Sequence, residues 1–64
     1  QQLSMMSVVQ YAIEFRNGSF FQNLEAERGG PKEKAQKFNS KQECIDFMNK
    51  HEWIYFNGGM EKPV

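Results

Sequence analysis

The sequence has only one cysteine, Cys44, and one histidine, His51. A lone cysteine cannot form a disulfide within the chain, and these two residues supply too few donors for a structural zinc site. We therefore expect no disulfide framework, no metal site and no cofactor. A reducing, cytoplasmic setting follows as the default expectation.

Long hydrophobic runs are also missing. No apolar segment approaches the roughly 20 residues that a membrane-spanning helix needs, and the N-terminus lacks the basic-then-apolar pattern of a signal peptide. We therefore expect no contact with a membrane. Because the chain begins with Gln1, we interpret residues 1–6 as a cloning remnant or a disordered N-terminus, with a natural start at Met5 or Met6.

An excess of charge of one sign is absent as well. Eight basic and eight acidic residues give a net charge of zero, which argues against a disordered tail and against a globally basic nucleic-acid binder. Hydrophobic residues make up 39% of the chain, so we predict one folded domain over residues 7–60. In a chain this short the core alone supplies only roughly 3–5 kcal/mol, so a partner or a dimer contact would add to its stability.

The strongest local signal that is present is Asn17-Gly18, between two apolar-rich runs. Asn-Gly tolerates the positive φ angles of a two-residue type I′ turn, so it predicts a β-hairpin. Such a loop would place Phe15 opposite Phe20 and Glu14 opposite Phe21. One face would carry Tyr11, Ile13, Phe15, Phe20 and Leu24, and the other Gln10, Ala12, Glu14, Arg16 and Phe21. Either the loop is longer and the register shifts, or Phe21 marks a functional surface on the polar face.

The segment after the hairpin, residues 25–38, gives weaker secondary-structure signals. Residues 25–31 are polar and contain Gly-Gly-Pro, which predicts a loop or one helical turn. Residues 32–37 fit either a short helix opened by Pro31 or part of a third strand. We favour a short turn followed by a brief strand at residues 35–38, with Phe38 turned inward.

Ser40 and Glu43 have the spacing of a capping box, in which each side chain accepts a hydrogen bond from the other residue's amide. A helix of about three turns is therefore predicted from Lys41. Residues 53–56 are aromatic and β-prone, so we predict a final short strand there and a tail at residues 61–64. The predicted fold class is α+β: a small antiparallel β-sheet, made of the hairpin plus one or two short strands, with a single α-helix packed on one face.

No catalytic set is recognisable in the sequence. Cys44 and His51 are seven residues apart, which on a helix puts them roughly 10 Å apart and beyond the reach of a nucleophile pair. We interpret Cys44 as a small core residue and His51 as a helix-terminal residue. The carboxylates are scattered singly, and neither Gly-Gly pair belongs to a phosphate-binding motif. We therefore predict that the protein is not an enzyme.

A local excess of positive charge is the first candidate functional surface. Between residues 28 and 41 there are five basic residues and one acid, a net charge of +4. These side chains would steer an acidic partner, or would contact phosphates while a base stacks on the ring of Phe21. The residues are Arg28, Lys32, Lys34, Lys37 and Lys41.

A surplus of aromatic side chains is the second candidate surface. Four of them give more large apolar surface than one helix can cover: Phe21, Trp53, Tyr55 and Phe56. Aromatic side chains dominate binding hot spots because they bury much area at low entropic cost, so we interpret these four as partner-binding anchors. The structural alternatives are a sheet covered on both faces, or Phe21 packed beneath the 25–31 loop.

Residues 35–43 read Ala-Gln-Lys-Phe-Asn-Ser-Lys-Gln-Glu and follow the Asn-Gly hairpin. A short sheet segment ending A-x-x-F that leads through a Ser cap into a single helix resembles a pattern in small early accessory proteins of tailed bacteriophages and related mobile elements. The similarity covers roughly residues 8–52. It implies a host-takeover or anti-defence protein that binds and neutralises a host protein, and it carries over no functional residues.

Our leading hypothesis is a small non-enzymatic binding protein, phage-encoded and acting in the cytoplasm of the host cell. It would bind and inhibit a host protein such as a toxin, defence effector or metabolic enzyme. The alternative is an RNA-binding or single-stranded nucleic-acid-binding protein that uses the basic 28–41 stretch. A second alternative is a structural or assembly protein that forms a homodimer or larger homo-oligomer.

Overall fold

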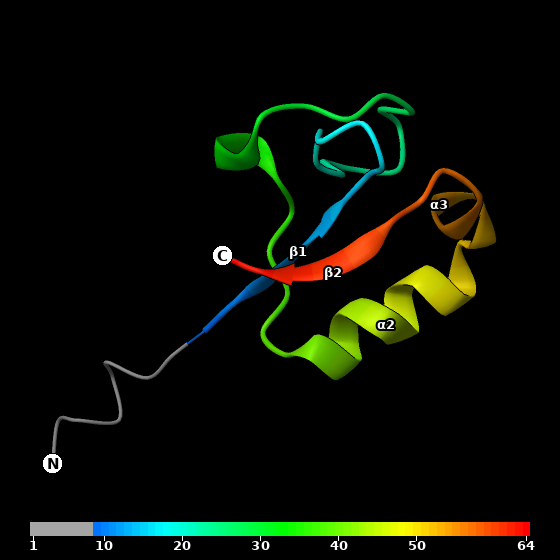
Figure 1. Ribbon diagram of the computed structural model, residues 1–64. Helices are drawn as coiled ribbons and strands as arrows, with labels where there is room; N and C mark the ends of the chain where they lie inside the picture. Colours follow the sequence, from blue (N-terminus) through cyan, green and yellow to red (C-terminus); the bar gives the residue numbers. More distant parts are fainter. Residues whose placement is uncertain (1–8) are drawn as a thin grey trace, which may run out of the picture.

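In the computed structural model of the protein, residues 9–64 are described, and the interpretation of residues 1–6 lies outside them. The elements are strand β1 (Tyr11–Glu14), the 3-10 helix η1 (Lys32–Lys34), helix α2 (Lys41–Lys50), helix α3 (Glu52–Phe56) and strand β2 (Met60–Pro63) (Figure 1). The two strands form an antiparallel sheet, and α2 packs against both of them. The protein is therefore of the predicted α+β class, with α3 as a second, short helix.

The sheet pairs the two ends of the described chain. Tyr11 lies opposite Pro63 and Glu14 opposite Met60, and the Val64 N–H extends the pairing with a 2.8 Å hydrogen bond to the Gln10 carbonyl. The prediction that residues 61–64 form a tail is therefore wrong. This segment has no β-branched or aromatic run, so its strand conformation comes from pairing with β1 and not from local propensity.

The hairpin at Asn17-Gly18 has a three-residue loop, so the predicted two-residue type I′ turn is wrong. The Phe15 N–H donates to the Ser19 carbonyl at 2.7 Å, and the Gly18 N–H donates to the Phe15 carbonyl at 2.9 Å. Gly18 has a φ of 92°, while Asn17 does not have the positive φ that a type I′ turn requires of it. The Asn17 side-chain oxygen instead accepts hydrogen bonds from the Ser19 N–H at 3.0 Å and from the Ser19 hydroxyl at 2.6 Å.

The longer loop shifts the hairpin register by one residue. Phe20 now bridges to Glu14, and the Phe21 N–H donates to the Ile13 carbonyl at 2.9 Å. Because side chains alternate between the faces of a strand, a one-residue shift moves each side chain of the returning strand to the opposite face. Phe21 is therefore in the core and only 1% exposed, and Phe20 lies on the other face, away from Phe15.

Residues 35–38 run extended beside β1 after the turn of η1. Phe38 forms an antiparallel bridge with Tyr11 through hydrogen bonds of 2.7 and 2.8 Å, and its side chain is buried as predicted. The segment remains an isolated bridge and not the predicted strand. The reason is that it divides its hydrogen bonds between two segments: the Gln36 N–H donates to the Phe21 carbonyl at 3.0 Å.

Helix α2 begins where the sequence predicts. The Ser40 hydroxyl accepts a hydrogen bond from the Glu43 N–H at 3.1 Å, and the helix runs from Lys41. The reciprocal half of the predicted capping box differs, because the Glu43 carboxylate accepts from the Asn39 N–H at 3.2 Å and not from Ser40. The inward face of the helix carries the buried Cys44 and Met48 and the half-buried Ile45 and Phe47.

Residues 53–56 are helical, so the strand predicted for them is wrong. Helix α3 ends in a Schellman motif: the Gly58 N–H donates to the Tyr55 carbonyl at 2.8 Å, and the Gly59 N–H donates to the Ile54 carbonyl at 2.9 Å. Gly58 adopts a φ of 79°, which glycine adopts at no steric cost. The Gly-Gly pair therefore caps a helix, and burial of Ile54 attaches that helix to the core.

The main core lies between the sheet, the hairpin and the two α-helices. It consists of Ile13, Phe15, Phe21, Phe38, Cys44, Met48 and Ile54. A smaller cluster on the opposite face of β1 consists of Ala12, Phe20 and Ala35, with Val64 packed against it. The sheet is thus covered on both faces, which was one of the structural alternatives left open by the sequence.

Candidate functional site

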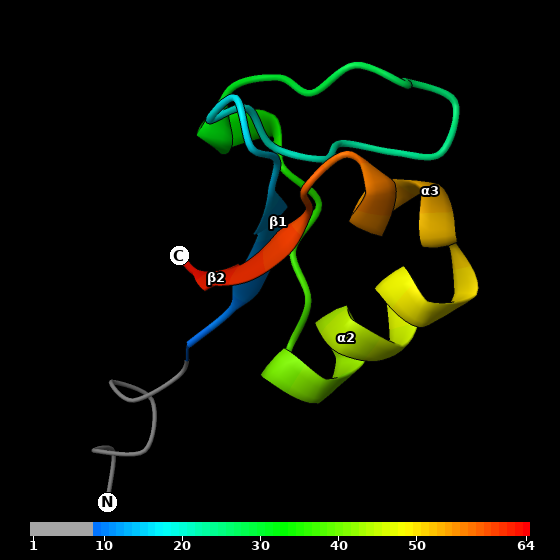
Figure 2. The same ribbon diagram turned by 45° about the vertical axis from the view of Figure 1, so that its right-hand side comes forward.

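Phe56 is the most exposed large hydrophobic side chain in the described part of the chain, at 79%. It is the last residue of α3 and lines a groove of about 550 Å³. The other walls of this groove are the hairpin loop and residues 27–29. Figure 2 shows the long loop after the hairpin crossing the top of the molecule toward the side of α3. We call this space the Phe56 groove.

The Phe56 groove combines an aromatic lining with charged residues. The buried Phe15 is part of the lining, and its ring stacks with Trp53 at a centroid distance of 6.3 Å. Arg16 lines the groove from the hairpin, and Glu27 and Arg28 line it from the loop. An apolar group and a charged group of a ligand therefore both find complementary partners within one short span.

Arg16 is positioned by the end of α3. Its side chain lies across Gly58, where a Cβ would be 2.8 Å from the Arg16 Cβ and 3.1 Å from its Cζ. The backbone N–H of Arg16 also donates a hydrogen bond to the Asn57 carbonyl, with an N–O distance of 3.5 Å. The glycine that caps α3 thus also makes room for an arginine of the hairpin beside Phe56.

Two smaller grooves adjoin the Phe56 groove. One, of about 370 Å³, shares Glu27 and Asn57 with it and adds the exposed Leu24 and the half-buried Trp53. The other, of about 440 Å³, shares Phe15 and Arg16 and adds the exposed Met60. The three grooves form one continuous surface around the end of α3.

The four predicted aromatic anchors do not form one surface. Phe21 is buried, so its predicted role as an exposed anchor is wrong. Phe56 and Trp53 line adjoining grooves, but Tyr55 is 43% exposed and lines none of these three. Arg16 in the Phe56 groove and Leu24 in the adjoining groove were not expected from the sequence, because their placement depends on the hairpin register and on the helical conformation of α3.

The predicted basic stretch is divided between separate surfaces. All five side chains are exposed, yet only Arg28 lines the Phe56 groove. Lys41 pairs with Glu61 at 3.9 Å, and the Lys37 ammonium donates to the Ala35 carbonyl at 3.0 Å. The backbone of η1, which carries Lys32 and Lys34, lies on the other side of the sheet from α3 in both views (Figures 1 and 2). The ring proposed to stack on a nucleic-acid base, that of Phe21, is buried.

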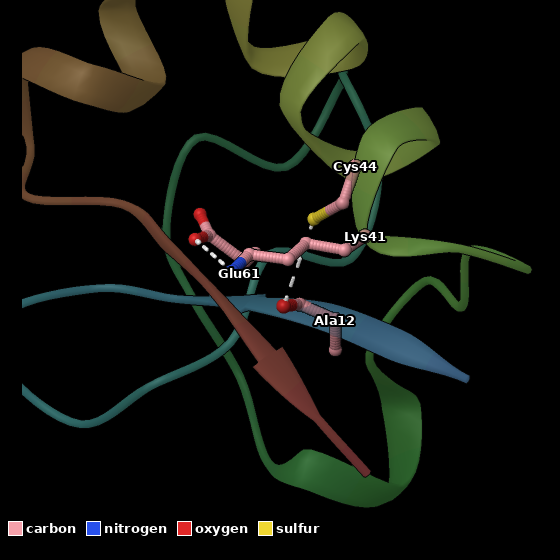
Figure 3. A network of polar contacts seen from close by, with 4 residues as sticks. All are labelled: Ala12, Lys41, Cys44 and Glu61. Carbon is pink, nitrogen blue, oxygen red and sulfur yellow. Dashed lines mark hydrogen bonds and ion pairs between the residues drawn. The ribbon is translucent and has the colours of Figure 1, made fainter. Parts of the chain in front are cut away.

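Cys44 belongs to the fold and not to a reactive site (Figure 3). Its buried thiol points to the Ala12 carbonyl, with a sulfur–oxygen distance of 3.8 Å. Burial, with a smaller contribution from the nearby negative charge of Glu61, raises the pKa of the thiol from 9.0 to about 11. The thiol therefore stays protonated near neutral pH, which is the opposite of what an activated nucleophile requires.

His51 joins the two helices. It follows α2 and precedes α3, and its ring lies against that of Phe47 at a centroid distance of 4.6 Å. Within residues 9–64, no three His, Cys, Asp or Glu side chains come together as a metal site. The helices in this part of the chain are all too short or too polar to cross a bilayer.

No protein-family model matches the sequence, and comparison with curated proteins and with solved structures gives no match.

Proposed function

We propose that the protein is a small non-enzymatic binding protein that acts by occupying a surface of another protein. The observation that carries this proposal is the exposed ring of Phe56 beside a groove lined by Phe15 and two arginines. Phenylalanine and arginine are both enriched at protein–protein interfaces relative to the rest of the protein surface. Burying an exposed phenylalanine side chain contributes about 1.5–3 kcal/mol of free energy. A partner that covers Phe56 would therefore bind more tightly by up to this amount.

The surface around Phe56 is formed before a partner arrives. Capping of α3 through Gly58 and Gly59 fixes the end of the helix, and the stack of Phe15 on Trp53 fixes the wall beside it. A preformed surface loses little conformational entropy when it binds. This supports a role as a rigid docking module.

The nature of the partner is part of the same proposal. The resemblance of residues 8–52 to phage accessory proteins suggests a host protein as the target, and inhibition by covering its functional surface as the effect. A role without catalysis is in keeping with Cys44, because a buried thiol with a raised pKa is a poor nucleophile.

A capture experiment with three forms of the protein tests this proposal. Wild type, Phe56→Ala and Tyr55→Ala are immobilised and incubated with bacterial lysate, bound proteins are identified by mass spectrometry, and affinities are then measured with the purified partner. Tyr55→Ala is the matched control, since it removes an exposed aromatic ring from the same helix but outside the three grooves.

We expect Phe56→Ala to weaken binding by roughly thirtyfold, the effect of losing a hot spot worth about 2 kcal/mol, and Tyr55→Ala to change it by less than about threefold. Equal capture by the wild type and Phe56→Ala would contradict the proposal. Circular dichroism of all three proteins shows that the variants remain folded.

A further inference from the structure

The Phe56 groove holds two arginines that form no ion pair within the described residues. Arg16 comes from the hairpin and Arg28 from the long loop. No carboxylate of residues 9–64 lies within 4.0 Å of either guanidinium, and residues 1–8 contain no acidic side chain. Two positive charges from separate segments therefore line the same groove, available to an anionic group.

Both arginines are attached to segments that hydrogen bonds hold in place. The Arg16 side chain lies across Gly58, as described above. The loop that carries Arg28 is tied to the hairpin two residues later, where Phe20 and Gly30 exchange two backbone hydrogen bonds of 2.8 Å each. The fold thus sets the backbone position of both arginines, and Gly58 provides the space that the Arg16 side chain occupies.

The same groove is lined by the exposed ring of Phe56 and, deeper, by the buried Phe15. We infer that the groove binds an acidic segment of the partner protein, with a carboxylate at Arg16 and Arg28 and a neighbouring apolar side chain against Phe56. This inference rests on the proposed function and specifies the chemistry of the partner. Arginine is suited to this contact because its planar guanidinium matches the geometry of a carboxylate.

A peptide fits the groove better than a nucleic acid does. Glu27 lines the same groove next to Arg28, and its negative charge repels any anionic group placed beside it. A peptide can place its carboxylate at the arginines and a backbone N–H near Glu27, whereas a nucleic-acid backbone carries a negative charge at every nucleotide and has no donor to offer there. The 3-10 helix η1, which carries the lysines that would extend a phosphate-binding path, lies on the other side of the sheet from α3 (Figures 1 and 2).

The test is an NMR titration of the ¹⁵N-labelled protein with a defined probe. The probe is an N-acetylated, C-amidated peptide of alternating glutamate and leucine residues, and its counterpart has lysine in place of each glutamate. We expect the acidic peptide to shift the amide signals of Arg16, Arg28 and Phe56, and the basic peptide to leave them unchanged. Absence of shifts with the acidic peptide overturns the inference.

Charge reversal provides the matched control. The double variant Arg16→Glu, Arg28→Glu should weaken peptide binding roughly tenfold or more, since like charges then face each other. The double variant Lys32→Glu, Lys34→Glu has the same net charge and should bind as the wild type does. Equal weakening by both pairs would mean that net charge alone attracts the peptide, which overturns the inference.

Two further results would overturn the inference that the groove binds an acidic segment. If a thymidine oligonucleotide displaces the acidic peptide at equal concentration, the groove binds nucleic acid. If light scattering shows a dimer that Phe56→Ala dissociates, the groove is filled by a second copy of the chain.

Capture of the partner by the Phe56→Ala variant and by the arginine-reversal variant distinguishes failure of this inference from failure of the proposed function. If Phe56→Ala abolishes capture and the Arg16→Glu, Arg28→Glu variant does not, the binding function stands and the acidic-segment inference fails. If Phe56→Ala has no effect on capture, the proposed function itself fails.

Discussion

Phe21 donates its backbone N–H to the carbonyl of Ile13 at 2.9 Å, and both side chains belong to the main core. This pairing settles a question that the sequence left open. A loop shorter by one residue would place Phe21 opposite Glu14 on the other face of the hairpin. The register thus decides whether this ring stabilises the domain or forms a binding surface, and here it stabilises the domain.

Phe21→Ala should unfold the protein or bring it close to unfolding. Truncating a buried phenylalanine costs about 3–5 kcal/mol, which matches the roughly 3–5 kcal/mol that a core of this size supplies. Phe56→Ala is the matched control, because it removes the same ring from an exposed position and should change stability by less than about 0.5 kcal/mol. Urea denaturation followed by circular dichroism measures both, and similar losses would contradict the assignment of Phe21 to the core.

Gly58→Ala should destabilise the protein more than Gly18→Ala does. Both glycines have positive φ, at 79° and 92°, so each substitution costs about 1–2 kcal/mol in backbone strain. Only at Gly58 would the new Cβ meet another residue, 2.8 Å from the Arg16 Cβ, while Gly18 has no neighbouring atom within 4 Å. Thermal unfolding of the two variants checks this order. The same or a smaller effect at Gly58 would show that Arg16 moves aside freely.

Ser40→Ala should cost about 1 kcal/mol by removing the N-cap of α2. The lost interaction is the 3.1 Å hydrogen bond from the Glu43 N–H to the Ser40 hydroxyl, and hydrogen exchange of that amide should accelerate. Ser40→Asp should retain the cap and most of the stability. Gln42→Ala, one position before the capped amide, serves as the control and should leave Glu43 exchange unchanged.

The Cys44 thiol should make stability fall in alkaline solution. Its pKa is raised from 9.0 to about 11 in the folded protein, so between these values the unfolded chain loses the proton while the native state keeps it. The stabilising contribution is therefore fully present below pH 9 and is lost as the pH rises toward about 11. Urea denaturation of the wild type and Cys44→Ala across this range should show their stability difference shrinking with pH, and a constant difference would contradict the raised pKa.

The parts of the fold that the sequence predicts correctly are governed by local chemistry. The Ser40 cap needs only a hydroxyl three residues before the Glu43 amide, and the start of α2 follows from it. The inward positions of Cys44 and Met48 follow from helical periodicity. The hairpin also exists where Asn17-Gly18 places it, because Gly18 takes up a positive φ in the observed turn as it would in the predicted one.

The elements that the sequence analysis missed depend on contacts between distant segments. Residues 60–63 become a strand because β1 offers unpaired backbone groups to them, and nothing in their own composition indicates this. Residues 53–56 have high β-propensity but form a helix, because the Gly58–Gly59 cap and the burial of Ile54 outweigh that propensity.

The candidate site also combines residues recognisable from their type with residues placed by contacts between distant segments. Phe56 and Arg28, which both line the Phe56 groove, were proposed as site residues from residue type alone, and that role stays a prediction. Arg16 joins the same groove, and Leu24 the adjoining one, only after the hairpin register and the helical end of α3 are known.

Residue chemistry and interactions within one turn are enough to predict the helix cap, the position of the hairpin and the core placement of Cys44, and the pattern of predicted elements indicates the α+β class. The face on which each aromatic ring of the hairpin lies depends on the tertiary structure. Side chains alternate between the two faces of a strand, so one extra loop residue moves Phe21 into the main core and Phe20 into the smaller cluster on the opposite face. The hairpin register is therefore determined by packing against the core and not by any local sequence signal.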